Sequence, residues 1–334
     1  MDGVLIIDKP QGITSHDVVA VARRVLGEKR IGHTGTLDPL ATGVLPLACG
    51  RATRLVRFLT ASDKEYDASI LFGVTTDTLD ITGTETSRSG AAPSREALVD
   101  ALASLTGEYL QMPPAYSAKK VGGRRAYELA RRDEPVALTA APVRVRRLEL
   151  LEAGDDRPST SLGARCRISL TCSAGFYVRS LVRDLGERCG TGACLEALRR
   201  TRSGDFRIDE ATPLDALEPA NSESRIPDPG SRRSNPESRI PNPWMETLLI
   251  PMEKLLLDFP AVTVTSEGLA RISHGQQVRA SDLVGSAPPG PGEWVRLLDS
   301  SGALVGLGTP IGGRGLVDPP RSTPGVLHPE VVLI

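Results

Sequence analysis

The chain has 334 residues, of which 40% are hydrophobic and 24% charged, and its formal net charge is −1. This length allows one large and one small domain with a buried core, and the near-neutral charge argues against a generic polyanion binder. Five cysteines without a CxxC pair and four scattered histidines show no zinc pattern. The first residues resemble neither a signal peptide nor a membrane span, so we expect a soluble, cytoplasmic protein without a metal.

The N-terminal part of the chain alternates short apolar runs with helical patterns. Apolar residues recur at helical spacing between Ser15, which can cap a helix, and Gly27, which can end it. Between residues 66 and 72 they alternate with mostly polar residues, which predicts a strand with one buried face. In chain order we expect a strand at 4–7, a helix at 15–26, a buried run at 44–49, a helix from about Thr53, a strand at 66–72 and a helix at 94–105.

The second half of the chain continues this mixture of strands and helices. Strands and helices do not alternate strictly, so the fold class is α+β, with a mainly antiparallel mixed sheet flanked by helices. We expect strands at 143–151 and 165–171, a helix at 177–188, and, near the C-terminus, strands at 262–265, 294–298, 303–307 and 331–334 around a helix at 266–273.

A low-complexity segment lies between the helix expected at 177–188 and the C-terminal group of strands. Residues 219–243 contain Ser-Arg-Ile-Pro twice among further Ser, Pro, Asn and Arg residues. This composition cannot bury a core, so the segment is expected to be a disordered surface insertion. We therefore divide the chain into a large domain at 1–258, which includes the insertion, and a small β-rich domain at 259–334.

The most informative stretch is residues 32–43, Gly-His-Thr-Gly-Thr-Leu-Asp-Pro-Leu-Ala-Thr-Gly. Its glycines allow a backbone to approach a ligand closely, and Pro39 fixes the turn after Asp38. A lone Asp-Pro is usually a turn in which the Asp side chain caps the backbone. A carboxylate stiffened on both sides is also what a reactive acid requires, and the companion motifs below favour that second interpretation.

Positive charge is concentrated in two segments. Residues 114–132 hold six lysines and arginines against one glutamate, and residues 164–207 hold nine arginines against four acids. Such clusters are typical of contacts with a phosphate backbone, although solvated helix faces give the same pattern. The candidate backbone contacts in the first segment are Lys119, Lys120, Arg124 and Arg125.

Several short motifs follow one another in a characteristic order. They are Asp8-Lys9-Pro10-x-Gly12, the 32–43 segment, Lys64-x-Tyr66, Gly-Phe-Tyr-Val-Arg-Ser-Leu at 175–181, Gly190-x-Gly192, Leu198-Arg199-Arg200 and Leu-His-Pro-Glu at 327–330. Together they resemble the bacterial tRNA pseudouridine synthase B (TruB) family over almost the whole chain outside 219–243. The resemblance implies a pseudouridine-synthase fold followed by a PUA-like RNA-binding domain.

It also implies an activity: isomerisation of the T-loop uridine at position 55 of tRNA to pseudouridine, without cofactor or metal. The base is flipped out, the N1–C1′ bond breaks, the base rotates and C5 bonds to C1′. No redox carrier is needed, in agreement with the absence of Rossmann and Walker motifs. The alternatives are a non-catalytic tRNA-binding or tRNA-folding module and an RNA base transglycosylase.

The resemblance assigns Asp38 to the sugar, where it attacks C1′ or takes the 2′ proton; the sequence does not choose between these routes. Arg179 is the expected partner that keeps Asp38 ionised. Tyr66 is expected on the target base and is a candidate for removing the C5 proton, although a core tyrosine would look the same.

Four further residues form the expected substrate-binding set. Lys9 resembles a residue that supports the Asp38 loop, and His33 one that fills the space left by the flipped base. Tyr177 and Leu198 match residues that pack around the uracil. Without the resemblance they would be read as a turn lysine, a loop histidine and plain core residues.

The resemblance further implies that segment 114–132 closes over the T loop of tRNA, the expected partner. In relatives the C-terminal domain touches the acceptor end of tRNA. A monomer is the default expectation.

Overall fold

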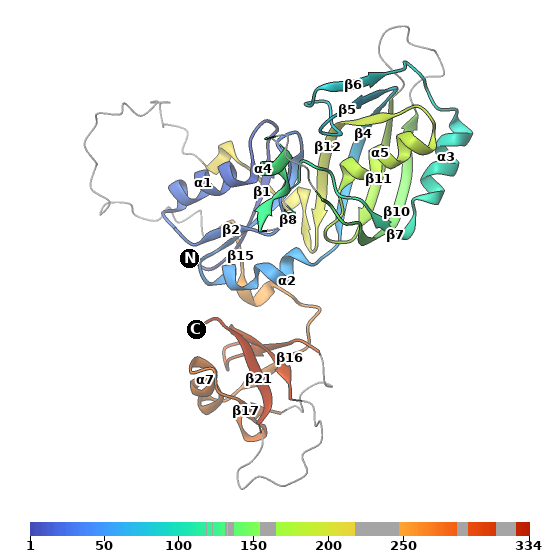
Figure 1. The fold of residues 1–334 in the computed structure, drawn as a ribbon. Coiled ribbons are helices and arrows are strands. Elements are labelled where there is room, and N and C mark those ends of the chain that lie inside the picture. Colours follow the sequence, from blue (N-terminus) through green and yellow to red (C-terminus); the bar gives the residue numbers. More distant parts are fainter. Residues whose placement is uncertain are drawn as a thin grey trace, which may run out of the picture.

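The computed structural model describes residues 1–117, 119–121, 123–130, 132, 137–153, 165–217, 247–285, 293–311 and 325–334. The segment expected as a disordered insertion, 219–243, lies outside the described residues. Within them, the chain forms a large sheet with helices packed on it and a second, smaller sheet near the C-terminus (Figure 1). This agrees with the predicted α+β class. The domain boundary at residue 258 stays a prediction.

The larger sheet has eleven strands among the described residues. Most neighbours are antiparallel, while the β1–β14 and β3–β12 pairs are parallel, which makes it the mixed sheet that was predicted. Its main path is β14 (Thr212–Pro213), β1 (Gly3–Lys9), β3 (Thr42–Cys49), β12 (Ala193–Ser203), β4 (Lys64–Phe72), β11 (Arg165–Cys172), β10 (Ala141–Ala153) and β7 (Gly107–Gln111), with β2 (Ile31–His33), β13 (Phe206–Arg207) and β15 (Leu249–Pro251) beside it.

Amphipathic helices cover this sheet. In α5 (Val178–Arg188) the apolar positions recur every three or four residues and are buried, as in Leu181 and Leu185. Helices α3 (Arg95–Ser104) and α5 pack on each other and over β10 and β12 (Figure 1). The remaining elements of the larger domain are α1 (Ser15–Leu26), η1 (Gly50–Leu55), α2 (Val56–Thr60), α4 (Ala126–Ala130), η2 (Ile208–Glu210), η3 (Asp215–Leu217), η5 (Met252–Lys254) and the strand pairs β5 (Val74–Thr76)–β6 (Glu85–Arg88) and β8 (Lys120–Val121)–β9 (Arg124–Arg125).

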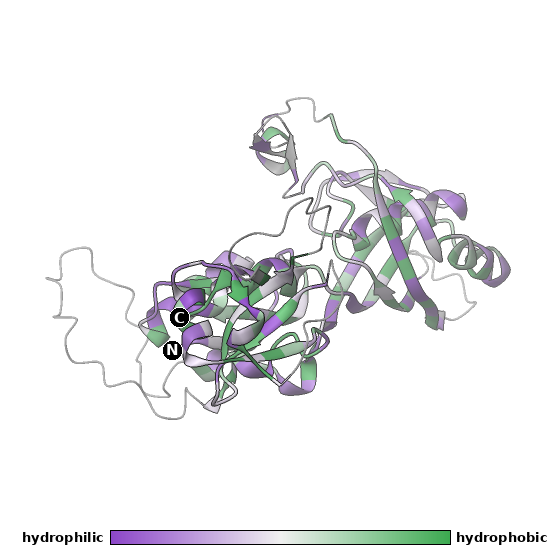
Figure 2. Ribbon diagram, turned by 90° about the horizontal axis from the view of Figure 1, so that it is seen from below, coloured by the Kyte–Doolittle hydropathy of each residue, from purple (hydrophilic) through white to green (hydrophobic). Residues whose placement is uncertain are grey.

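The second sheet forms a separate β-rich unit, as predicted. Its order is β17 (Val278–Arg279), β21 (Gly325–Val332), β20 (Leu304–Pro310), β19 (Val295–Leu298), β16 (Ala261–Val264) and β18 (Leu283–Val284), accompanied by α7 (Ser266–Ser273) and η6 (Ala280–Asp282). Purple and green alternate along the long strands of the molecule in Figure 2, as expected for strands with one buried face.

The two units share an apolar cluster. Val4 and Val44 of the larger sheet pack in the same cluster as Leu307 and Leu333. Arg51 adds a hydrogen bond from its Nη1 to the carbonyl oxygen of Leu333, at 2.7 Å. The C-terminal unit therefore packs against strands β1 and β3 of the larger sheet.

Several local predictions need correction. Thr14, not Ser15, caps α1, because its hydroxyl pairs with Asp17 in a capping box while the Ser15 hydroxyl turns inward. Thr53, the expected start of a helix, lies inside the 3₁₀ turn η1, and the α-helix α2 follows directly after that turn. The last strand, β21, begins well before residue 331. Strand β12 was not predicted, and it carries part of the site described next.

Candidate active site

The Asp38 loop connects β2 to β3 and is fixed from three sides. Lys9 is fully buried, and its Nζ donates hydrogen bonds to the carbonyl oxygens of Ala41 (2.7 Å) and Pro10 (2.8 Å). The backbone NH of Gly12 donates to the carbonyl of Pro39 at 2.8 Å. Lys9 thus lies behind the loop and holds its main chain.

The Ser15 side chain, which the sequence predicted as a helix cap, fixes the loop from a second side. Its hydroxyl accepts a hydrogen bond from the backbone NH of Leu37 (2.9 Å) and donates to the carbonyl of the same residue (3.0 Å). The residue is buried. Both main-chain groups of the residue before Asp38 are therefore satisfied by one side chain.

A close strand contact provides the third. Gly43 has φ +100°, and a Cβ there would lie 2.2 Å from the carbonyl oxygen of Arg200, its partner on β12. Only glycine permits this approach. It brings β12 directly beside the end of the Asp38 loop.

Asp38 and Arg179 form the ion pair that the sequence led us to expect. Arg179 Nε lies 2.9 Å from Asp38 Oδ2, and the Arg179 side chain is 7% exposed against 41% for Asp38. The two remaining guanidinium nitrogens donate to the carbonyls of Thr78 (3.0 Å) and Tyr116 (2.8 Å). The arginine is thereby fixed in one orientation, with the carboxylate presented to solvent.

Asp80 is a second, buried carboxylate beside Arg179, and sequence reasoning missed it. Its Oδ2 lies 3.8 Å from Arg179 Nε. Its other oxygen accepts hydrogen bonds from the Thr78 hydroxyl (2.9 Å) and from the backbone NH of Thr82 (3.0 Å). A buried guanidinium between two carboxylates is far better compensated than one with a single partner.

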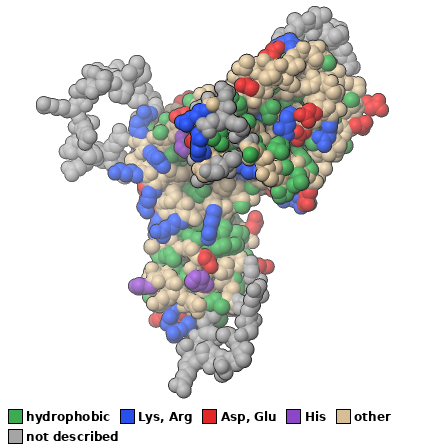
Figure 3. Space-filling model, in the orientation of Figure 1, with side chains coloured by type: hydrophobic (Ala, Val, Ile, Leu, Met, Phe, Trp, Pro, Cys, Tyr) green, Lys and Arg blue, Asp and Glu red, His purple; other side chains and the backbone are tan. Residues whose placement is uncertain are grey.

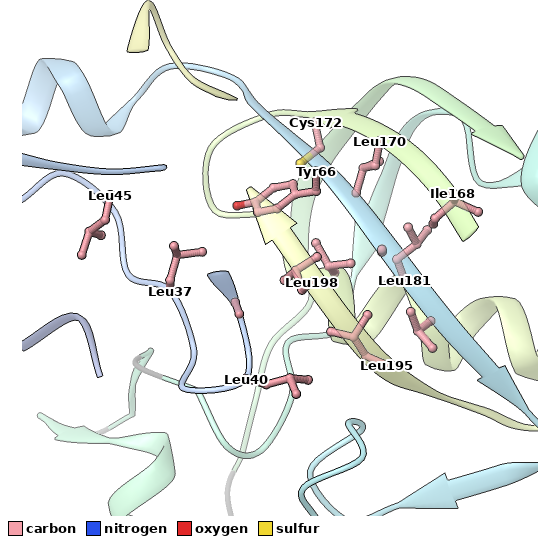
Figure 4. Close-up of a cluster of buried hydrophobic side chains, with 14 of the residues drawn as sticks. Leu37, Leu40, Leu45, Tyr66, Ile168, Leu170, Cys172, Leu181, Leu195 and Leu198 are labelled. Atoms are coloured by element: carbon pink, nitrogen blue, oxygen red, sulfur yellow. The ribbon is translucent and has the colours of Figure 1, made fainter. Parts of the chain in front are cut away.

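The ion pair borders a cavity of about 260 Å³, and Tyr66 lies in its wall. Tyr66 is 8% exposed. Figure 4 shows its ring among Leu198, Leu37 and Cys172, with the hydroxyl turned toward the side on which Leu37 lies. Burial raises the pKa of the Tyr66 phenol, whereas the positive charge of Arg200 and a hydrogen bond to it act in the opposite direction.

Tyr177 and Leu198 also line this cavity. The main chain of Tyr177 is held by Gln111, whose Oε1 accepts from the Tyr177 NH at 2.9 Å and whose Nε2 donates to its carbonyl at 3.1 Å. The full lining is Gly35, Thr36, Leu37, Asp38, Thr60, Lys64, Tyr66, Ser117, Ser173, Gly175, Phe176, Tyr177, Val178, Arg179, Leu198 and Arg200.

The other predicted site residues lie outside this lining. Lys9 is behind the loop, as described. His33 ends β2, with its ring 5.5 Å from that of His16 in an edge-on arrangement. Lys119 donates to the carbonyl of Thr139 at 2.8 Å.

The basic segment reaches the cavity through other residues. Lys120 and Arg125 are backbone partners in the β8–β9 hairpin, which Arg124 shares. Just before this hairpin, the carbonyl of Tyr116 accepts a hydrogen bond from Arg179, and Ser117 lines the cavity.

In the described part of the chain, no three His, Cys, Asp or Glu side chains gather as a metal site requires. None of the helices that the structure describes is long and apolar enough to cross a membrane.

Comparisons with known proteins identify the family of the chain. Residues 23–178 match a family model described as TruB family pseudouridylate synthase, N-terminal domain. Residues 179–257 and 260–321 match the corresponding C-terminal models. A protein of Solibacter usitatus named tRNA pseudouridine synthase B is 40% identical over 100% of both chains. The chain belongs to the TruB family.

Two further TruB relatives carry the same name. The protein of Aromatoleum aromaticum is 38% identical over 96% of this chain and 92% of its own, and that of Burkholderia mallei 35% over 100% and 97%. The resemblance predicted from sequence is therefore confirmed, and the protein is a pseudouridine synthase.

The fold is shared with solved structures. A Cbf5–Nop10–Gar1 complex contains a chain that matches with a TM-score of 0.69 and 25% identity, over 100% of this chain and 85% of that one. A chain of an H/ACA ribonucleoprotein bound to a substrate RNA matches with a TM-score of 0.67 at 23% identity, over 99% and 85%. The TruB chain thus has the pseudouridine-synthase fold with a C-terminal β-rich domain.

Proposed function

We propose that this enzyme converts the uridine at position 55, in the T loop of tRNA, to pseudouridine. The names of the full-length relatives support tRNA as the substrate. The observation that carries the proposal is the ion pair of Asp38 and Arg179 at the border of a cavity of about 260 Å³ with Tyr66 in its wall.

Asp38 acts on the ribose of the flipped nucleotide. Its carboxylate either bonds to C1′ or removes the proton from C2′, and in both routes the electron pair of the N1–C1′ bond leaves with the base. C5 of the rotated base then bonds to C1′ as the Asp38–C1′ bond breaks, or, in the second route, as the proton returns to C2′, and the C5 proton is lost to solvent. Both routes use the negative charge of the carboxylate, and the Arg179 guanidinium that pairs with it lies 2.9 Å away.

The base is held by the walls of the cavity. Tyr66 stacks on the uracil, and Tyr177 and Leu198 pack around it. Stacking of a base on an aromatic ring contributes about 1–3 kcal/mol, similar to the few kcal/mol that extrusion of a nucleotide costs. Stacking therefore retains the flipped base but does not drive the flip alone.

The residues outside the cavity serve the RNA. Lys9 keeps the Asp38 loop in place, and His33 fills the space that the flipped base leaves. Lys119, Lys120, Arg124 and Arg125 contact phosphates of the T loop. Lys and Arg side chains are numerous along the left-hand margin of the molecule in Figure 3, which suits recognition by shape and phosphate contacts.

The test uses tRNA that carries tritium at C5 of its uridines. The enzyme should release one tritium per tRNA to water, and mapping of the product should find pseudouridine at position 55 alone. Asp38→Asn, which keeps the side-chain shape and removes the charge, should abolish release while the Kd for tRNA changes less than threefold.

Other outcomes would contradict the proposal. Binding of tRNA without any release would indicate a non-catalytic module. Exchange of the uracil for a different base, without pseudouridine, would indicate a transglycosylase. Full activity of Asp38→Asn would remove Asp38 from the reaction.

A further inference from the structure

Two cationic side chains flank Tyr66 on the floor of the cavity. Lys64 precedes Tyr66 by two residues on β4, so both side chains point to the same face of the sheet. Arg200 is the direct cross-strand partner of Tyr66 on β12. A Cβ on Gly35 would lie 3.5 Å from Arg200 Nη1 and 4.0 Å from Lys64 Cε, so both cations lie beneath the Asp38 loop.

Both cations are buried without an anionic partner. Lys64 is 6% exposed and Arg200 1%. Arg200 donates to the carbonyls of Val44 (2.7 Å) and Gly35 (3.1 Å), and Lys64 donates to the carbonyls of Thr60 (2.6 Å) and Ser62. In the part of the chain that the structure describes, neither forms an ion pair. Arg179, by contrast, lies between Asp38 and Asp80.

This arrangement is unfavourable for the fold alone. Burying a charge that carbonyl dipoles only partly compensate destabilises the fold, and apolar side chains of similar size would fill the same space more favourably. The two like charges also oppose each other: burial and the charge of Arg200 lower the pKa of Lys64 to about 8. Fixed charges of this kind suit an anion that exists only during the reaction.

The reaction generates such an anion at this place. When the N1–C1′ bond breaks, its electron pair stays on N1, and the detached uracil carries one negative charge spread over N1, O2 and O4. The Asp38 carboxylate is already neutralised by Arg179, so it does not need these two cations. The base must then turn from N1 to C5 without leaving. An electrostatic field from beneath holds an anion in every orientation, whereas directed hydrogen bonds would break as it turns.

On the basis of the proposed function, we propose that Lys64 and Arg200 form a cationic floor that stabilises the detached uracil anion and retains it while it rotates. No atom is exchanged with the floor. The glycosidic pair moves to the base, the pair at C5 forms the new bond to C1′, and the C5 proton leaves to solvent.

The test compares leaving bases of different acidity in single-turnover reactions. The substrates are tRNA with uridine or with 5-fluorouridine at position 55, and disappearance of the intact N-glycoside is measured for each. Fluorine makes the base more acidic, so its anion needs less help. Lys64→Met and Arg200→Met should each lower the rate with uridine on the order of 10²-fold, the usual effect of removing one such electrostatic group. The factor by which they lower the rate with 5-fluorouridine should be at least ten times smaller.

Arg199→Met is the matched control. Arg199 neighbours Arg200 on β12 but points to the other face, where it pairs with Asp8 at 2.8 Å, and it is 44% exposed. Its ratio of the two rates should equal that of the wild type. Arg200→Lys retains the charge, so its ratio of the two rates should be closer to that of the wild type than the ratio of Arg200→Met. This variant also tests Arg200 if Arg200→Met folds poorly.

The outcomes separate this inference from the function beneath it. If the wild type forms no pseudouridine, the proposed function fails. If the wild type is active but Lys64→Met and Arg200→Met lose the same factor with both bases, the floor is only structural and the inference is wrong. Increased escape of free uracil in Lys64→Met would support retention during rotation, and unchanged escape would contradict it.

Discussion

The two sheets of this molecule bury different kinds of side chain. The larger sheet and helix α5 bury Lys64, Arg179 and Arg200 around one cavity, and Lys9 is buried behind the Asp38 loop. In the described part of the C-terminal unit, Asp282 is the one buried charged residue, and it pairs with Arg271 at 3.2 Å and accepts from the NH of Arg279 at 2.8 Å.

The two regions differ in how the charge of their buried side chains is compensated. The buried aspartate of the C-terminal unit closes a local turn and its charge is compensated nearby. The buried cations of the larger sheet are held mostly by main-chain carbonyls, an arrangement that stability alone would not favour. Substitutions should therefore affect turnover in the first region and only folding in the second.

The largest contrast is expected from Arg179→Lys. Lysine keeps the positive charge but loses the planar fork that binds Asp38, Thr78 and Tyr116 together. The rate of tritium release in single turnover should fall about 10²–10³-fold, with little change in the Kd for tRNA. Arg271→Lys, which alters the pair in the C-terminal unit, should leave the rate within twofold. Unchanged turnover in Arg179→Lys would show that this arginine is only structural.

A smaller contrast concerns two hydroxyl side chains near helix starts. Ser15→Ala removes the hydroxyl that pairs with both main-chain groups of Leu37. Thr265→Ala removes the hydroxyl that caps α7 by accepting a hydrogen bond from the Gly268 NH at 3.2 Å. Each should lower the free energy of unfolding by about 1–2 kcal/mol. Only Ser15→Ala should also lower kcat, by about tenfold, because a displaced Asp38 loop loses alignment.

Urea unfolding and steady-state kinetics on both variants test this pair. Equal losses of kcat in the two proteins would show that Ser15 acts on general stability and not on the loop.

The pH dependence of Lys64 should separate stability from activity. Its pKa lies near 8 in the folded protein, well below the usual 10.5 of the unfolded chain. The folded state then binds fewer protons than the unfolded state above pH 8, so the destabilisation is complete below pH 8 and is relieved as the pH rises toward 10.5. Relative to Lys64→Met, the wild type should gain on the order of 1 kcal/mol of stability per pH unit in this window.

Activity should change in the opposite direction, because the cation is lost. The groups that face Lys64 are the carbonyls of Thr60 and Ser62, Arg200 on β12, Cys172 on β11 and Asp63. Lys9, whose pKa burial also lowers to about 8, adds to the stability change in both proteins and cancels in the comparison. The wild-type rate should therefore fall between pH 8 and 9.5, whereas the rate of Lys64→Met should not change for this reason. Equal pH dependence of the two rates would contradict the role proposed for Lys64.

The sequence predicted those parts of the site in which local chemistry and position coincide. The glycines and proline around Asp38 are needed by the turn itself, and α7 has the bounds that its apolar spacing indicates. Strand β12 escaped prediction because Arg200 points inward where the alternation rule expects an apolar residue. A buried arginine is uncommon, so the period of the strand was hidden.

Asp80 and the second role of Ser15 escaped for a different reason. Asp80 acquires its meaning from Arg179, which lies far along the chain and reaches it only through the fold. Ser15 has the composition of a helix cap, and the adjacent Thr14 takes that task. Tertiary contacts of this kind leave no pattern in the local sequence.

The smallest effect should come from the basic segment beside the cavity. Lys119→Ala and Arg124→Ala each remove one expected phosphate contact, so the KM for tRNA should rise a few-fold while kcat stays constant, and the slope of log Kd against log salt should fall by about one per residue. Because the segment lies next to the cavity through Tyr116 and Ser117, the factor should be the same for full-length tRNA and for an isolated T-stem-loop RNA. A loss seen only with full-length tRNA would mean that this segment meets another part of the substrate, which would assign to it the role expected here of the C-terminal unit.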